Sequence, residues 1–137
     1  MNGTTAKWRE TAIGRLAEIL VLDQFARNMF RDDAQAFAGD ALALVLAAEA
    51  IGAEADREVT ETQRAFFYMP YMHSESLPVH TQAVRLFTAY GSDIHLEYEL
   101  KHKAVLEEFG RYPHRNDALG RESTPEEVAW LEAGGGF

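Results

Sequence analysis

The sequence has no cysteine, few prolines and no long apolar run. Its 137 residues include 4 prolines and 0 cysteines. The absence of cysteine excludes a disulfide framework, a thiolate metal site and a cysteine nucleophile. The apolar segment "IGRLAEILVLDQF" contains Asp23 and is followed by Arg27, so it stops short of the roughly 18 residues of a membrane span. Because "MNGTTAKWRE" also lacks the pattern of a signal peptide, we expect a cytoplasmic protein with no membrane partner.

Basic residues are also scarce. There are 13 Lys and Arg against 22 Asp and Glu, which gives a formal net charge of −9. This charge repels the phosphates of nucleic acids, so we expect no nucleic-acid partner. The chain is long enough for one domain that folds without disulfides or metal. We predict a single domain over 1–137, with flexible ends at 1–7 and 134–137.

Helical periodicity is present along most of the chain. Apolar residues three and four positions apart predict helices at about 5–25, 40–52, 60–69, 78–90 and 92–109, with a sixth from Thr124. Thr60 with Gln63, and Thr124 with Glu127, have the spacing of capping boxes. Pro70 should end or kink the third helix. No segment alternates with the period of a strand. These features predict an all-α domain of about six helices packed as antiparallel pairs.

The burial of two helices can be predicted in more detail. In 92–109, the spacing of Ile94, Tyr98, Val105 and Phe109 indicates the face that packs against the core. His80 has no polar neighbour in its helix, so we expect it at the surface.

The histidines do not have the spacing of a metal site. His95 and His102 are two helical turns apart, roughly 10.5 Å, which is too far to share one ion. Glu99 and His102 have the Glu-x-x-His spacing of di-iron bundles, but a single copy is weak because two are needed. The sequence also lacks a Walker loop, a dinucleotide fingerprint and HExxH. We therefore expect no bound metal and no cofactor.

A first group of polar residues lies at the end of the first predicted helix, in "DQFARNMFR". Asp23 and Arg27 fall on the same side of the helix as Leu16 and are four residues apart, so they can form an ion pair. Either the helix leaves the core here, or the polar residues form a site. The neighbouring Gln24, Asn28 and Arg31 favour the site.

Two further groups follow helices. "MPYMHSE" contains His73 and Glu75 directly after the predicted end of the third helix. The segment 109–121 has three arginines against one aspartate, a local charge of +2 in a molecule of −9. A planar anion such as a carboxylate would use these guanidinium groups. Alternatively, the arginines pair with acidic side chains and hold the helices together.

Four segments, "LVLDQFARNMFR", "AFAGDALAL", "YMPYMHSE" and "FGRYPHRNDALGRESTPEE", together resemble the bacterial domain-of-unknown-function family 924. The resemblance runs from about Trp8 to Phe137. It implies an all-helical fold similar to tetratricopeptide-type helix pairs, in a soluble bacterial protein with no established activity. The polar positions that match are Asp23, Gln24, Arg27, Asn28, Arg31, His73, Glu75, His102, Arg111, His114, Arg115, Asn116 and Arg121.

These positions allow three interpretations. In the first, the polar cluster binds a small anionic or carboxylate ligand, or a peptide end. In the second, the protein is a hydrolase-like enzyme with His114 or His73 as general acid/base, Glu75 or Asp23 orienting that histidine, and arginines holding the substrate. In the third, the domain is a structural or protein-interaction scaffold. We favour the first interpretation, and we expect the histidines and arginines to meet in one place.

Overall fold

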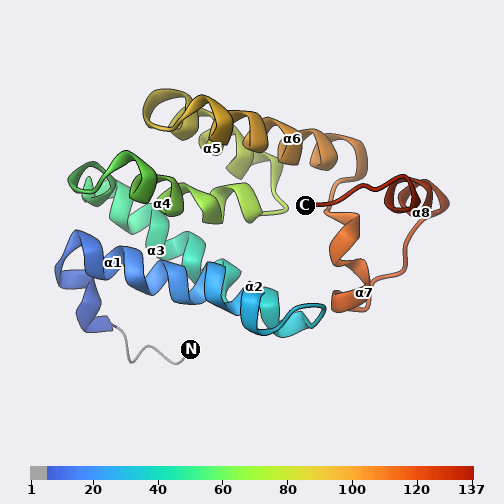
Figure 1. Cartoon of the computed structure of the whole chain (residues 1–137), viewed down its shortest axis with the longest axis horizontal. Helices are drawn as coiled ribbons and strands as arrows, with labels where there is room; N and C mark the ends of the chain where they lie inside the picture. Colours follow the sequence, from blue (N-terminus) through green and yellow to red (C-terminus); the bar gives the residue numbers. More distant parts are fainter. Residues whose placement is uncertain (1–5) are drawn as a thin grey trace.

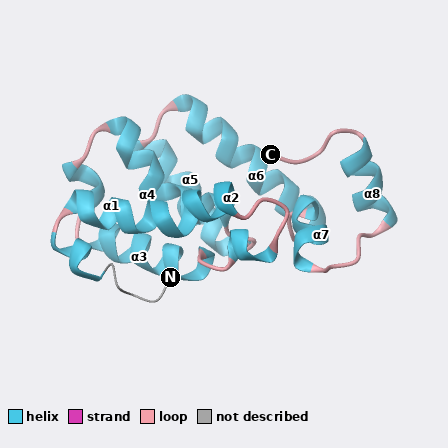
Figure 2. Cartoon of the chain, turned by 60° about the horizontal axis from the view of Figure 1, so that its bottom comes forward, coloured by secondary structure: helices cyan, strands magenta, loops and turns pink. Residues whose placement is uncertain are grey.

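The structure is a computed structural model that describes residues 6–137. Residues 1–5, most of the expected flexible N-terminal end, lie outside the described part. The α-helices are α1 (Ala12–Leu20), α2 (Ala26–Met29), α3 (Asp40–Gly52), α4 (Glu61–His73), α5 (Leu77–Tyr90), α6 (Asp93–Phe109), α7 (Asn116–Leu119) and α8 (Pro125–Glu132) (Figure 1). The 3-10 turns are η1 (Ala6–Glu10), η3 (Ala34–Phe37), η4 (Ala55–Glu58) and η5 (Pro113–Arg115), and η2 (Val21–Phe25) is a π-helical turn. Residues 6–137 contain no strand, so the all-α prediction is confirmed (Figure 2).

The two predicted capping boxes are confirmed, and one predicted helix end is wrong. Capping boxes at Thr60 and Thr124 open α4 and α8. Gly110 ends α6 in the left-handed region, with φ of 73°, which favours glycine. α4 does not end at Pro70 but continues to His73. Burial of the following turn in the core outweighs the hydrogen bond that a proline cannot donate.

The first predicted helix is interrupted in two places. Thr11 ends the 3-10 turn η1 and caps α1, with its side chain accepting from the Gly14 N–H. After α1 the helix widens into η2, whose Leu22 and Asp23 are both buried. The chain then continues through α2 to Met29. The sequence therefore predicts the extent of this region well, but not its π-helical turn.

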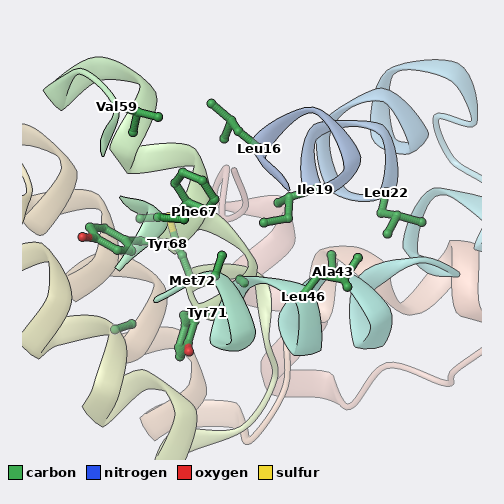
Figure 3. Close-up of a cluster of buried hydrophobic side chains, with 14 of the residues drawn as sticks. Leu16, Ile19, Leu22, Ala43, Leu46, Val59, Phe67, Tyr68, Tyr71 and Met72 are labelled. Carbon is green, nitrogen blue, oxygen red and sulfur yellow. The ribbon is translucent and has the colours of Figure 1, made fainter. Parts of the chain in front are cut away.

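The main core lies between α1, α3, α4 and α5. Successive long helices pack against one another, α3 on α4, α4 on α5 and α5 on α6, while α1 contacts both α3 and α4. Figure 3 shows side chains of α1 and η2, among them Ile19 and Leu22, directed at Ala43 and Leu46 of α3. The expected tetratricopeptide-like arrangement of these pairs stays a prediction.

The apolar helix α3 is part of this core. By length and composition alone, Ala34–Gly52 could cross a membrane. In the structure the segment comprises η3 and α3, and Ala43, Leu46 and Ala47 are buried against the neighbouring helices. One face of α3 therefore packs in the core, while Leu42 and Val45 on its other face are exposed.

The buried face of α6 differs from the predicted one. Ile94 and Tyr98 are exposed, whereas Glu99 and His102 are buried together with Val105. His80, expected at the surface, is also fully buried: its Nδ1 lies 2.7 Å from a carboxylate oxygen of Glu99 across the contact between α5 and α6. The contact engages one oxygen of Glu99, while the other, Oε1, is buried without a partner among the described residues. Hydrophobic periodicity was thus wrong for Ile94 and Tyr98, whereas Val105 is buried and Phe109 packs against it, as predicted.

α7 and α8 lie at one end of the molecule, beyond the stacked helices (Figure 1). A second, smaller core joins this end to α6: Tyr112 is buried with Val105 and Leu106, and Trp130 of α8 packs against Phe109. Residues 134–137 had been expected to form a flexible end. Instead they return to the body of the protein, where the ring of Phe137 stacks on His102 with centroids 3.6 Å apart.

Candidate functional site

A cleft of about 640 Å³ opens where α2, the end of α4, α6 and the segment 112–118 meet. Its volume is in the range of small-molecule sites. Phe37 and Phe137 contribute aromatic surfaces to it. Its polar lining comprises Arg27, Asn28, Arg31, Asp32, His73, His102, Tyr112, His114 and Arg115. Most of these residues belong to the three polar groups found in the sequence, so the structure brings those groups together.

Asp23 connects two walls of the cleft from behind. Its buried carboxylate accepts from Arg27 Nη1 at 3.0 Å, and its Oδ1 lies 2.8 Å from Nδ1 of His73. Gln24 donates to its other oxygen at 2.7 Å. Burial alone would raise the pKa of Asp23, but the charges and hydrogen bonds of His73 and Arg27 outweigh burial and lower it. Asp23 is therefore an ionised carboxylate that orients the imidazole of His73.

Arg27 is largely satisfied by carboxylates. Besides Asp23, it donates to both oxygens of Asp40, at 2.8 and 2.9 Å. This bidentate pair joins α2 to the first turn of α3. Sequence analysis identified the pairing of Arg27 with Asp23 but assigned Asp40 only to the helix start. A carboxylate at a helix N-terminus has a structural role of its own, so nothing in the sequence indicated the second partner.

Arg115 is buried in the cleft wall and is held mainly by groups other than carboxylates. Its guanidinium lies between the rings of Phe37 and Tyr112, 4.6 and 4.8 Å from their centroids. Nη2 donates to the His73 carbonyl at 2.8 Å, and the nearest ion pair, to Asp40, is long at 3.7 Å. Nε is buried and has no partner among the described residues. An unsatisfied donor in a charged, buried group is expensive unless something binds it.

Three histidines face the cleft. Nδ1 of His102 lies 2.7 Å from the Tyr98 carbonyl, so Nδ1 carries the proton and Nε2 is an acceptor. Burial lowers the pKa of His102 to about 4. Burial also lowers the pKa of His114 to about 4, and the charge of Arg115 adds to the effect. His102 and His114 are thus neutral at pH 7, and Nδ1 of His114 is buried without a partner among residues 6–137.

Glu75 fixes the segment 112–121 to the end of α4. Its carboxylate accepts from Arg121 at 2.9 and 3.1 Å and from the Tyr112 N–H at 2.6 Å. Burial raises the pKa of Glu75, but these hydrogen bonds outweigh it and the pKa is lowered. Asn116 accepts from Arg121 at 3.0 Å and donates to Ser123. Glu75, Asn116 and Arg121 therefore position the cleft wall rather than line it.

Arg111 lies outside the cleft. It donates to both carboxylate oxygens of Glu127, at 2.9 and 2.7 Å, and fastens α8 to the end of α6. The interpretation of Arg111 as a ligand-binding residue does not fit this position. Gln24 is also absent from the cleft lining, because its amide is directed at Asp23. Asn28 and Arg31 are exposed at the cleft rim, where their side chains are available to a ligand.

Sequence analysis missed the aromatic residues of the cleft. Phe37, Tyr112 and Phe137 each contact an arginine or histidine of the site. The position of Tyr112 inside the polar segment "RYPHRND" could have indicated that this ring belongs to the cleft. Among the described residues, no group of three or more His, Asp or Glu side chains is arranged to hold a metal ion. The absence of metal and cofactor stays a prediction.

Comparison with known proteins points to a family without an assigned function. Residues 1–135 match the family described as bacterial protein of unknown function (DUF924). The solved structure of a protein of unknown function from Agrobacterium tumefaciens is similar, with 43% sequence identity and a TM-score of 0.89. The similarity covers 94% of this chain and 73% of that chain. No functionally curated protein matches the chain.

Proposed function

The chain belongs to this bacterial family of unknown function, and from that premise we propose that it binds a small anionic or carboxylate ligand in the cleft. The observation that carries the proposal is the guanidinium of Arg115, which lines the cleft and has only a long 3.7 Å contact to a carboxylate, that of Asp40. This contact leaves the positive charge of Arg115 only partly compensated. An oxygen of a bound anion would pair with the guanidinium.

The charges around the cleft support an anion of low charge. Arg27 is engaged by Asp23 and Asp40, so Arg31 and Arg115 are the cations that remain for a ligand. Asp32 also lines the cleft and reduces the local positive charge. A small carboxylate fits this balance better than a highly charged polyphosphate does.

The test is a binding measurement with a matched pair of arginine variants. Succinate is titrated into the wild type, Arg115→Met and Arg85→Met, and the 15N signals of the arginine Nε groups are followed by NMR. Arg85 is exposed on α5 and does not line the cleft. We expect succinate to shift the Arg115 Nε signal in the wild type and in Arg85→Met, and to bind at least about tenfold more weakly to Arg115→Met. Equal binding by all three proteins would refute the proposal.

A second candidate function is general-base catalysis by His73. Asp23 holds Nδ1 of His73 at 2.8 Å, which leaves Nε2 as the acceptor at the cleft. His114, the other histidine considered for this role, has no carboxylate bound to its ring among the described residues and its pKa is lowered to about 4. The Asp23 contact therefore favours His73.

The catalytic candidate is tested with p-nitrophenyl esters and phosphate esters. We expect Asp23→Asn to lower the hydrolysis rate by at least about a hundredfold, because the wrong tautomer of His73 would be stabilised. The catalytic role is excluded if His73→Gln hydrolyses the same compounds as fast as the wild type.

A further inference from the structure

We propose that the ligand of the cleft is a carboxylate that also bears a hydrogen-bond donor, an amino or hydroxyl group, which binds the imidazole edge of His102. This inference rests on the proposed anion site and specifies the class of its ligand. It follows from the direction of the hydrogen bond that the His102 ring makes.

The ring of His102 is fixed as an acceptor by the group behind it. Its Nδ1 lies 2.7 Å from the Tyr98 carbonyl oxygen. A carbonyl oxygen only accepts, so Nδ1 carries the proton and the neutral ring offers a lone pair at Nε2. This Nε2 has no partner among the described residues and is not among the fully buried unsatisfied atoms, so it is open to the cleft that His102 lines.

His102 and Arg115 line the same cleft, so one small ligand can contact both. A single N–H or O–H of the ligand satisfies the lone pair at Nε2 of His102. A simple carboxylate, which has no N–H or O–H at neutral pH, would leave this lone pair unused or facing its own oxygens.

The donor and acceptor sides of the cleft belong to different elements. Arg115 of η5 supplies the buried guanidinium, whereas His102 lies in α6. His102 remains an acceptor over a wide pH range, because burial lowers its pKa to about 4. Phe137 covers one face of that ring and leaves its edge for the ligand. A molecule with a carboxylate at one end and a donor near it matches both sides.

Three acids of similar size separate the possibilities. Succinate has no donor at neutral pH, malate adds one hydroxyl group, and aspartate adds one ammonium group. Dissociation constants for each acid are measured by NMR titration with the wild type, Arg115→Met, His102→Phe and His95→Phe. The phenylalanine at 102 keeps the ring stacking with Phe137 but removes Nε2. His95→Phe is the matched control, because His95 lies on the same helix and does not line the cleft.

We expect malate or aspartate to bind at least about tenfold more tightly than succinate to the wild type and to His95→Phe. The preference should disappear in His102→Phe, while Arg115→Met weakens all three acids. The 15N shift of His102 Nε2 in the wild type should move with the preferred acid but not with succinate, which provides a readout if the variant fails to fold. Whichever of malate and aspartate binds more tightly identifies the donor as hydroxyl or ammonium.

The failures of the two proposals are distinguishable. If succinate binds as tightly as the other two acids and Arg115→Met still weakens it, the donor requirement is wrong and the anion site stands. A preference that persists in His102→Phe, with no change at Nε2, also overturns the donor requirement. If no acid binds, or if Arg115→Met binds all of them as well as the wild type does, both proposals fail together.

Discussion

At the scale of single residues, Arg115 combines two tasks in one side chain. Its guanidinium faces contact Phe37 and Tyr112, and Nη2 donates to the His73 carbonyl, while Nε is left without a partner among the described residues. The contacts with the rings and the carbonyl can be assigned to stability, and the guanidinium charge, which has only a 3.7 Å contact to Asp40, can be assigned to binding. Burial lowers the pKa of Arg115, which means that the charge itself is held at some cost in stability.

We therefore expect Arg115→Met to change the free energy of unfolding by less than about 2 kcal/mol. The lost contacts are offset by removal of a buried charge, and Asp40 keeps its bidentate bond to Arg27. The measurement is urea denaturation followed by circular dichroism. A loss of roughly 3 to 5 kcal/mol would instead show that Arg115 is a structural brace between helices.

A second prediction concerns acid. The pKa values of His102 and His114 are each lowered from 6.5 to about 4, so above pH 6.5 both the folded and the unfolded protein are neutral at these sites. As the pH falls from 6.5 towards 4, the unfolded chain takes up protons that the folded one does not. The free energy of unfolding should fall over this window. Urea denaturation at pH 7.5 and pH 5 measures the fall, and His102→Phe should reduce it.

The carboxylates act in a lower pH window. The pKa values of Asp23 and Glu75 are lowered, so their contribution is present above the pKa of the unfolded side chains and is lost as the pH falls through the folded values. A transition confined to pH below about 4 would thus point to the carboxylates. The control is His102→Phe: this low-pH transition should persist in the variant, which separates the effect of the carboxylates from that of the histidines.

Residue types and spacing predicted the cleft better than they predicted individual roles. Asp23, Arg27 and His73 were identified because polar groups on an apolar face, or directly after a helix, need partners. Arg111 was assigned to the ligand because its pairing with Glu127 depends on how α8 returns, which the sequence does not reveal. His80 was misplaced for a similar reason, since Glu99 reaches it from another helix.

At the scale of elements, α8 is held by one ion pair and a small apolar contact. Glu127 accepts from Arg111 and also from the Thr124 N–H of its own capping box. The hydrogen bonds from Arg111 lower the pKa of Glu127 to about 2. This ion pair and the contact of Trp130 with Phe109 are the main attachments of the helix.

We expect Glu127→Gln to destabilise α8 locally by roughly 1–2 kcal/mol, because glutamine keeps the capping acceptor but not the charge that pairs with Arg111. Hydrogen exchange of the amides in 125–132 measures this effect. Glu126→Gln, an exposed neighbour in the same turn, is the control and should leave the exchange unchanged. Faster exchange throughout α1 and α3 would contradict a local role.

The buried pair between α5 and α6 leads to a prediction about coupling. His80 and Glu99 are both fully buried, and His80 also contacts the Ser74 carbonyl and the Tyr112 hydroxyl. Burial raises the pKa of Glu99, although the hydrogen bond from His80 opposes it.

Removing one partner of this pair leaves the other unsatisfied, so His80→Leu and Glu99→Leu should each lower the free energy of unfolding by about 3–5 kcal/mol. The double variant should cost clearly less than the sum, as measured in a double-mutant cycle. Additive losses would indicate that the two side chains act independently.

The sequence predicted those helix boundaries that are fixed by a capping residue at the boundary itself. Thr60, Thr124 and Gly110 satisfy helix ends with their own side chain or backbone, so the sequence was sufficient. The prediction that α4 ends at Pro70 was wrong because α4 continues where the turn after Pro70 is buried. That burial is a property of the assembled core. The first half of α6 was misjudged because a buried polar contact, that of Glu99 with His80, lies where the periodicity predicted apolar side chains.

At the scale of the whole molecule, the cleft lies between a large core and a small one. The α1–α5 region buries many apolar side chains, while the C-terminal part relies on Val105, Leu106 and Tyr112. Arg27 and His73 belong to the first part, and Arg115 belongs to the second. Opening between the two parts would therefore change the shape of the cleft.

We predict that amides in 113–137 exchange with solvent faster than those in α3 and α4, because fewer buried contacts oppose local opening there. The preferred acid should slow exchange on both sides of the cleft, at 23–31 and at 113–119, since it binds only the closed arrangement. Hydrogen exchange with mass spectrometry measures both effects, and Arg115→Met is the control without ligand protection. Protection confined to one side would mean that the ligand does not bridge the two parts.

The π-helical turn at Val21–Phe25 separates the number of residues in the chain from the geometry of the cleft. A π-helical turn holds about one residue more than an α-helical turn. Deletion of Gln24 would return the turn to ordinary pitch, and Arg27 would keep nearly its present orientation relative to Ile19, because the wider turn already absorbs the additional residue. In evolutionary terms, this is a place where the chain can gain or lose one codon while the side chains that line the site stay where they are.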